Sequence, residues 1–488
     1  MADGLVLALD QGTTGTTVVA VGEDGVPRGR GYREITQHYP RPGWVEHDPE
    51  EIWQSVLGAT GDALRAAGAA ARNVLAVGIT NQRETLVLWN RRDGRPLHPA
   101  IVWQDRRTAA ACDRLREAGE GERVRRVTGL VIDPYFTATK LRWAIDNVEG
   151  ARQAAAGTID SWLVFRLTAG RLHATDASNA SRTLLLDIDG GTWSEEMADL
   201  FGVPLEGLPS VVASSGEVAR TDPAQFGGIE APIAGIAGDQ QAALFGQLCL
   251  EPGMAKNTYG TGSFVLLQTG PERVESKTGM LTTIAWLREG RLSYALEGAI
   301  FVTGAALQWL RDGLGVIKTA AEAGPLAESV ADSGGVFLVP AFTGLGAPYW
   351  DAHARGAILG LTRGTSRAHL VRAAVEAMAF QTADVIEAMA ADAGRGLQEL
   401  RVDGGASVMD FLCQLQADLL GIPVRRPKLI ETTALGAAYL AGRGAGVWGS
   451  EGGPWQLDRE FLPAISRDQA ATRLADWRRA VERVRGRQ

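Results

Sequence analysis

Two stretches of the chain repeat one pattern of apolar and polar positions. The first is LVLALDQGTTGTTVVAV at residues 5–21, and the second is AKNTYGTGSFVLLQ at residues 255–268. In both, a short turn of glycine and threonine separates two apolar runs, which predicts a β-hairpin. A single repeat of this length is weak evidence for duplication, but the two turns share the same chemistry.

Strands and helices are predicted to alternate through the rest of the chain. The continuous apolar run at 74–80 predicts a buried strand. A helix is expected after Asp48, with Pro49 in its first turn and Glu51 completing a capping box. A long helix is expected from Ser366 to a stop at Gly394. This alternation favours an α/β architecture with helices on the faces of sheets.

The segments at 233–248 and 399–421 each predict a strand, a turn and a helix. Between them, Pro252 and Gly253 interrupt a helical pattern just before the second hairpin. We therefore place a domain boundary there, dividing the chain into residues 1–250 and 251–488.

Composition excludes several classes of protein. The 488 residues, 45% hydrophobic and 22% charged, are typical of a globular protein of two or three domains. The net charge of −8 and the scattered basic residues argue against a nucleic-acid partner. Neither a membrane span nor a signal peptide is apparent. The three cysteines and six histidines show no metal or disulfide spacing, which indicates a cytoplasmic protein with reduced thiols.

Three turns could bind phosphate groups, although the chain has no P-loop motif and no protein-kinase motifs. They lie at 12–17, 260–263 and 404–407, each where a predicted strand ends. Backbone N–H groups in such glycine-rich turns form a concave anion site, and the third turn also precedes a helix. Any one of them alone is more often an ordinary turn. Three together favour a nucleoside triphosphate.

Two acids follow predicted strands. Asp10 ends the first strand, and Asp239 begins a helix after the strand at 232–238. They could be a turn aspartate and a helix N-cap. At the carboxyl ends of strands, where α/β sheets bind ligands, one could instead hold Mg²⁺ and the other accept a hydroxyl proton.

A second set of residues suits a small polyol, which needs hydrogen-bonding groups for its hydroxyls and aromatic walls for its carbon skeleton. The candidate acceptor residues are Arg83, Glu84, Trp103, Tyr135, Asp239, Gln240 and Phe264. Taken singly, the aromatic residues are more often core, and Arg83–Glu84 could be a surface ion pair.

Over nearly its whole length the sequence resembles the FGGY carbohydrate kinases of the actin-like ATPase superfamily. The motifs that carry the resemblance include LALDQGTTGTT, GITNQRET, GIAGDQQAALFGQL, KNTYGTGSF, VPAFTGLGAPYW and TALGAAYLAG. The resemblance implies an α/β fold of two actin-like (ribonuclease H-like) domains, each a mixed central sheet flanked by helices, with the active-site cleft between them. Residues 1–250 would bind glycerol and residues 251–488 the nucleotide.

The activity implied is ATP-dependent phosphorylation of glycerol to sn-glycerol 3-phosphate, with Asp239 as general base. Asp10 would orient Mg²⁺, with Asp239 as the other carboxylate at the metal, and the candidate acceptor residues would surround glycerol. The nucleotide would lie along Thr13, Thr14, Gly15, Thr261, Gly304, Gln308, Gly405 and Met409. Arg83–Glu84 in NQRET favours glycerol over pentuloses or gluconate.

Two residues depart from the family pattern. Thr17 stands where many relatives carry an arginine, and Met409 where an asparagine often faces the adenine. Family members are often dimers or tetramers, so the resemblance implies a homodimer or homotetramer. The alternative functions are a kinase for another small polyol, such as erythritol or a pentulose, and an actin- or chaperone-like ATPase without an acceptor site.

Overall fold

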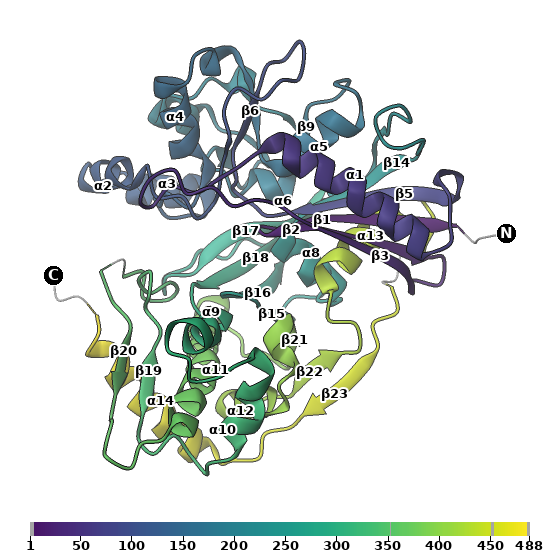
Figure 1. The fold of residues 1–488 in the computed structure, drawn as a ribbon. Coiled ribbons are helices and arrows are strands. Elements are labelled where there is room, and N and C mark those ends of the chain that lie inside the picture. The colour runs from purple at the N-terminus through teal and green to yellow at the C-terminus, as the bar shows by residue number, and fades with distance from the viewer. Residues whose placement is uncertain (1–3, 352, 450–452, 486–488) are drawn as a thin grey trace.

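The computed structural model describes residues 4–351, 353–449 and 453–485. Its first sheet has six strands in the order β13-β14-β5-β1-β2-β3 (Figure 1). These strands are β1 (Leu5–Gln11), β2 (Gly15–Gly22), β3 (Pro27–Glu34), β5 (Val74–Asn81), β13 (Ser215–Arg220) and β14 (Pro232–Gly238). The central strands β1, β5 and β14 are parallel and almost entirely buried, as expected of strands covered on both faces.

The second sheet has seven strands in the order β17-β18-β16-β15-β21-β22-β23. They are β15 (Ala255–Tyr259), β16 (Ser263–Gly270), β17 (Leu281–Arg288), β18 (Arg291–Ile300), β21 (Leu400–Asp403), β22 (Val424–Pro427) and β23 (Leu457–Phe461). From β18 to β23 the strands repeat the order and directions of β3 to β13 in the first sheet. The repeat noticed in two hairpins therefore extends to six strands, and both predicted hairpins are confirmed.

Two helices lie between the sheets, α8 (Asp239–Gly246) and α13 (Thr432–Gly444) (Figure 1). Glycine allows their close approach, because a Cβ on Gly436 would lie 1.8 Å from the carbonyl oxygen of Ala242. Although α13 comes late in the chain, it packs against β1, β5 and β14 of the first sheet. The division at residue 250 separates the strands of the two sheets. That residues 1–250 and 251–488 form the two domains remains a prediction, because α13 packs against the first sheet.

The opposite face of the first sheet is covered by α1 (Pro49–Ala66). Asp48 caps this helix by accepting from the backbone N–H of Glu50, as predicted. The expected capping box is wrong, since the Glu51 carboxylate instead accepts from the N–H and hydroxyl of Thr36.

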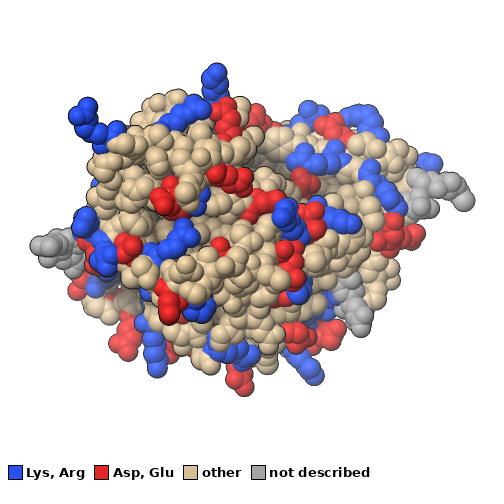
Figure 2. All heavy atoms as spheres, turned by 90° about the horizontal axis from the view of Figure 1, so that it is seen from below, with Lys and Arg blue, Asp and Glu red and all other residues tan. Residues whose placement is uncertain are grey.

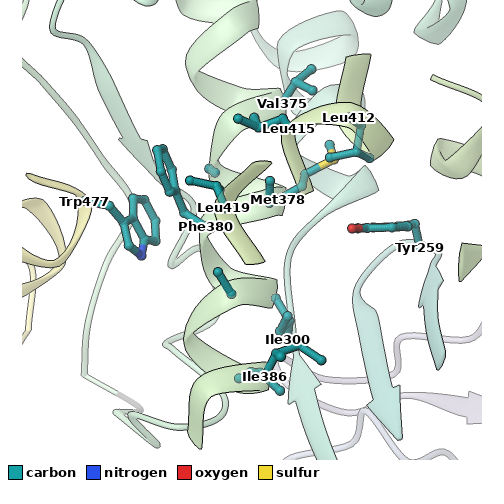
Figure 3. Packing of buried hydrophobic residues seen from close by; sticks show 14 of the residues in the cluster. Tyr259, Ile300, Val375, Met378, Phe380, Ile386, Leu412, Leu415, Leu419 and Trp477 are labelled. Atoms are coloured by element: carbon teal, nitrogen blue, oxygen red, sulfur yellow. The ribbon is translucent and has the colours of Figure 1, made fainter. Parts of the chain in front are cut away.

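The core of the second half surrounds α11 (Arg367–Ala393), which begins after Ser366 and ends at Gly394 as predicted. Figure 3 shows Phe380 of this helix beside Trp477 of α14 (Arg467–Glu482), with ring centroids 5.4 Å apart. On the other side lies Tyr259, whose hydroxyl donates to Gln416 of α12 (Asp410–Leu420) at 2.7 Å. This core therefore anchors the residue that precedes the turn at 260–263.

The remaining elements are short. The helices are α2 (Ala109–Glu117), α3 (Gly121–Thr128), α4 (Thr137–Asn147), α5 (Ile159–Leu167), α6 (Ala177–Ala180), α7 (Glu195–Phe201), α9 (Gly304–Gln308) and α10 (Ala323–Glu328). The two-stranded pairs are β4 (Glu46–His47) with β7 (Ala100–Ile101), β6 (Val87–Trp89) with β8 (Ala155–Gly157), β9 (Ala174–Asp176) with β12 (Ser210–Val212), β10 (Leu186–Asp187) with β11 (Thr192–Trp193), and β19 (Phe337–Val339) with β20 (Ala357–Leu359).

Charged side chains of both signs are interspersed over the face shown in Figure 2. The three cysteines are free and buried. Within the described ranges, no helix combines the length and the apolar character that crossing a bilayer requires.

Candidate active site

The predicted acids converge at one edge of the first sheet. Because β1, β5 and β14 are parallel neighbours, their carboxyl ends meet there, with Asp10 paired to Thr80 and Asn81 paired to Gly238. Asp239 follows β14 directly as the first residue of α8. The arrangement matches the usual ligand position in α/β sheets.

Asp10 is a partly buried carboxyl group that lies close to other acids. Burial raises its pKa to about 7, and the negative charges of Asp239 and Glu431 raise it further than Arg30 lowers it. Carboxylates that repel one another suit a hard cation, so these residues fit Mg²⁺. No cluster of three or more His, Cys, Asp or Glu that could hold a metal occurs in the described ranges. A magnesium ion here would need oxygens from water and phosphate as well.

Arg83 lies behind Asp239, with its guanidinium enclosed by protein. Its Nε is 3.0 Å from Oδ1 of Asp239, and its two Nη atoms lie 2.5 and 3.0 Å from the two oxygens of Glu297. Nη2 also donates to the Tyr135 hydroxyl at 3.4 Å. Burial alone would lower the pKa of Arg83, but Glu297 and Glu84 hold it well above its usual value.

Glu84 is also buried, and its backbone has a φ of 61°, a left-handed conformation that is uncommon for a residue other than glycine. Its carboxylate accepts from Nε of Arg182 at 2.7 Å. The surface-pair interpretation of Arg83–Glu84 is therefore wrong, since both side chains are 2% exposed. The Asp239 side chain is 31% exposed, so its carboxylate is the more accessible acid of the site.

A buried lysine holds the Glu84 and Tyr135 segments together. Nζ of Lys140 donates to the backbone carbonyl of Glu84 at 3.0 Å and to that of Tyr135 at 2.6 Å. Burial lowers the pKa of Lys140 to about 7. The left-handed backbone at Glu84 is thus fixed by a neighbouring side chain.

The aromatic candidates line the same site. Nε1 of Trp103 donates to Oγ1 of Thr13 at 3.0 Å, and its ring centroid is 5.6 Å from that of Tyr135. The Phe264 ring lies 5.8 Å from Cζ of Arg83. Trp103 and Phe264 are partly exposed rather than core.

Gln240, next to Asp239, is buried against a lysine from the second sheet. Nζ of Lys256 donates to its Oε1 at 2.5 Å, and burial lowers the pKa of Lys256 to about 8. All seven candidate acceptor residues are thus brought into one neighbourhood. Sequence reasoning missed the four charged residues that support them, namely Lys140, Arg182, Lys256 and Glu297.

The two hairpin turns have similar closures. The N–H of Gly12 donates to the carbonyl of Gly15 at 2.9 Å, and that of Gly260 donates to the carbonyl of Gly262 at 2.8 Å. Thr14 and Thr261 are exposed at the tips. These turns leave hydroxyl groups available to a phosphate.

The start of α9 docks on the second turn. The N–H of Gly304 donates to the carbonyl of Gly260 at 3.1 Å, and that of Ala305 to the carbonyl of Thr261 at 3.0 Å. Gln308, at the other end of α9, is exposed. Gly304 and Thr261 therefore lie together, with Gln308 at the far end of the same short helix.

The third turn follows β21, which is the parallel neighbour of β15. Gly404 has a φ of 82° there, and Gly405 is exposed. Met409, at the N-terminus of α12, lies near Gly324. Thr17 faces Asp10 directly across the β1–β2 pairing.

Comparisons with known proteins identify the family of this chain. The models for the N-terminal and C-terminal domains of the FGGY family of carbohydrate kinases match residues 5–246 and 255–445. A glycerol kinase of Dechloromonas aromatica is 58% identical over 99% of this chain and 98% of its own. Glycerol kinase 2 of Thermotoga maritima is 53% identical over 99% of both chains.

Solved structures share the whole fold. A crystal structure of Plasmodium falciparum glycerol kinase with ADP has a TM-score of 0.91 and 33% identity, covering 100% of this chain and 99% of that one. A gluconate kinase from Lactobacillus acidophilus shares the fold at a TM-score of 0.86 with 22% identity, covering 98% of this chain and 97% of the other. With two family domains matched in order along the described sheets, this chain belongs to the FGGY family of carbohydrate kinases.

Proposed function

We propose that this protein transfers the terminal phosphoryl group of ATP to a terminal hydroxyl of glycerol, giving sn-glycerol 3-phosphate. The observation that carries the proposal is the partly exposed Asp239 carboxylate, held by Arg83 at the carboxyl edge of the first sheet. Relatives named glycerol kinase, 53–58% identical over almost the whole chain, support glycerol over another polyol.

Asp239 acts as the general base. Both polar contacts that the described residues make with its carboxylate fall on Oδ1, from Nε of Arg83 at 3.0 Å and from the N–H of Gln240 at 2.7 Å. Oδ2 is then left to accept the hydroxyl proton as the oxygen attacks phosphorus. The glycerol hydroxyls are oriented by Arg83, Glu84, Tyr135 and Gln240, while Trp103 and Phe264 contact the carbon skeleton.

The nucleotide is held by the three turns and the start of α9. The residues assigned to it are Thr13, Thr14, Gly15, Thr261, Gly304, Gln308, Gly405 and Met409. Asp10, with Asp239 nearby, would hold Mg²⁺, which when bound neutralises charge on the phosphates. An arginine is absent at Thr17, so hydroxyls and backbone N–H groups carry more of the phosphate binding here.

A coupled assay of ADP release, with and without glycerol, tests the proposal. We expect release to depend on glycerol and to be much slower with erythritol or a pentulose. Slow ADP release at the same rate with and without glycerol would support an actin-like ATPase instead. We further expect a cytoplasmic homodimer or homotetramer, which light scattering after size-exclusion chromatography would check for the assembly.

A further inference from the structure

Four buried charged side chains form a closed ring behind Asp239. Arg83 binds both carboxylate oxygens of Glu297, at 2.5 and 3.0 Å. Arg182 joins the two acids, with Nη2 2.9 Å from Oε1 of Glu297 and Nε 2.7 Å from Oε1 of Glu84. None of the four side chains is more than 2% exposed. Pairing of this kind lets charges remain ionised in an interior.

One member of this ring comes from the other half of the chain. Arg83 and Glu84 follow β5 and Arg182 follows α6, whereas Glu297 lies on β18 of the second sheet. The β17–β18 hairpin reaches the first half, where Thr283 contacts the Ser181 hydroxyl at 2.9 Å. Figure 1 shows these strands lying close below the first half. The acceptor site is therefore incomplete without a residue of the nucleotide half.

Glu297 determines how the Arg83 guanidinium is oriented. A carboxylate that engages both Nη atoms fixes the guanidinium plane, as in bidentate arginine–carboxylate pairs. That plane directs Nε toward Oδ1 of Asp239, 3.0 Å away. Burial would raise the pKa of Glu297, but Arg182 and Arg83 hold it below its usual value, so the carboxylate is ionised.

We propose that Glu297 is a positioning residue for phosphoryl transfer, acting through Arg83 to hold the Asp239 carboxylate in place for the acceptor hydroxyl. This inference rests on the proposed function. It also accounts for the enclosed position of Arg83, whose guanidinium contacts Asp239, Gln241, Tyr135 and Glu297.

Glu297→Gln tests the inference, because it keeps the shape and removes the charge. We expect kcat/KM for glycerol to fall roughly 10²-fold, the usual loss from a misplaced reacting group, with the KM for ATP unchanged. The matched control is Glu376→Gln on α11, where a buried glutamate accepts from Arg372 at 2.9 Å and Arg473 at 3.1 Å. That variant should lose thermal stability and keep its kcat/KM.

A double-mutant cycle separates positioning from general stability. In an Arg83→Lys background, adding Glu297→Gln should cause little further loss of kcat/KM, because the two residues act in series. Should Glu297→Gln fail to fold, Glu297→Asp keeps the charge but is one methylene too short to engage both arginines, and it should show the same selective loss.

Two results would overturn the inference: a folded Glu297 variant with wild-type kcat/KM for glycerol, or losses that add fully in the Arg83→Lys background. Both presuppose an active wild type. A wild-type protein without glycerol-dependent turnover would instead refute the proposed function itself.

Discussion

Nζ of Lys256 lies 2.5 Å from Oε1 of Gln240 and 2.8 Å from Oγ1 of Thr258. The amide oxygen of Gln240 accepts from the ammonium group, so its NH₂ group must face away from Lys256. Lys256 lies on β15, the strand that leads into the turn at 260–263. The strand β15 thus orients the Gln240 amide, which we assign to the acceptor site, and leads into the turn at 260–263, which we assign to phosphate.

Replacing Lys256 with methionine should weaken use of glycerol. The change removes the ammonium and keeps a similar length, which leaves the Gln240 amide without a fixed orientation. A hydrogen bond to a charged group contributes about 1.5–3 kcal/mol, so we expect kcat/KM for glycerol to fall roughly 10- to 100-fold. Steady-state kinetics at saturating ATP measures this. Thr258→Val is the control, because it leaves the contact with Gln240 intact; equal losses in both variants would contradict the assignment.

Replacing Asp239 with asparagine should abolish most turnover. The amide keeps an oxygen for Arg83 and Gln240 but cannot accept the hydroxyl proton. A positioned base contributes about 10²–10⁴ in rate, so kcat should fall by at least that range, with a smaller change in the KM for glycerol. Wild-type turnover in a folded Asp239→Asn protein would rule Asp239 out as the base.

Replacing Gly304 with alanine should weaken nucleotide use selectively. A Cβ at this position would lie 2.5 Å from the carbonyl oxygen of Gly260, which forces α9 away from the second turn. Overpacking of this kind typically costs about 1–3 kcal/mol. We expect the KM for ATP to rise while the KM for glycerol stays constant.

Gly61→Ala is the matched control for Gly304→Ala. Gly61 is an exposed residue within α1, and nothing lies within 4 Å of a Cβ added there. Alanine is the better helix former, so the control should gain about 0.5–1 kcal/mol of stability and leave both KM values unchanged. An unaltered KM for ATP in Gly304→Ala would remove the basis for assigning α9 to the nucleotide.

Sequence patterns predicted those features that are set locally. The hairpin turn after Asp10 and the strand–helix junction at Asp239 depend on neighbouring residues, and parallel strands then bring the two acids to one edge. The partners of single charged residues inside apolar strands could not be predicted in this way. Glu297 in YALEGAI and Lys256 in GMAKNTY indicate that each has a buried partner. Those partners, Arg83 and Gln240, lie 214 and 16 residues away in the sequence, and no local pattern identifies them.

The position of α13 was also beyond local reasoning. Its sequence TALGAAYLAG is small and apolar on all sides, which is typical of a fully buried helix. Nothing in that pattern says that it packs against a sheet formed by the first half of the chain. That placement depends on close contacts such as the one between Gly78 and the carbonyl group of Ala437. A Cβ added at Gly78 would lie only 2.2 Å from that carbonyl oxygen.

Acidification should destabilise the fold through His47, a buried residue whose Nε2 lies 2.8 Å from Oε1 of Gln37. Burial, and then the charge of His38, lowers its pKa from 6.5 to about 4. Between these two pKa values His47 is protonated in the unfolded chain and neutral in the folded chain. The contribution of His47 to stability is therefore complete above pH 6.5 and is lost as the pH falls below 6.5. From pH 7 to pH 5 the loss is about 2 kcal/mol.

Asp10 and Asp160, whose pKa values burial raises to about 7 and about 6, act with the opposite sign. Urea unfolding at both pH values should therefore show a smaller acid loss, or a net gain, for His47→Gln than for the wild type; equal changes in the two proteins would mean that His47 is protonated in the folded state.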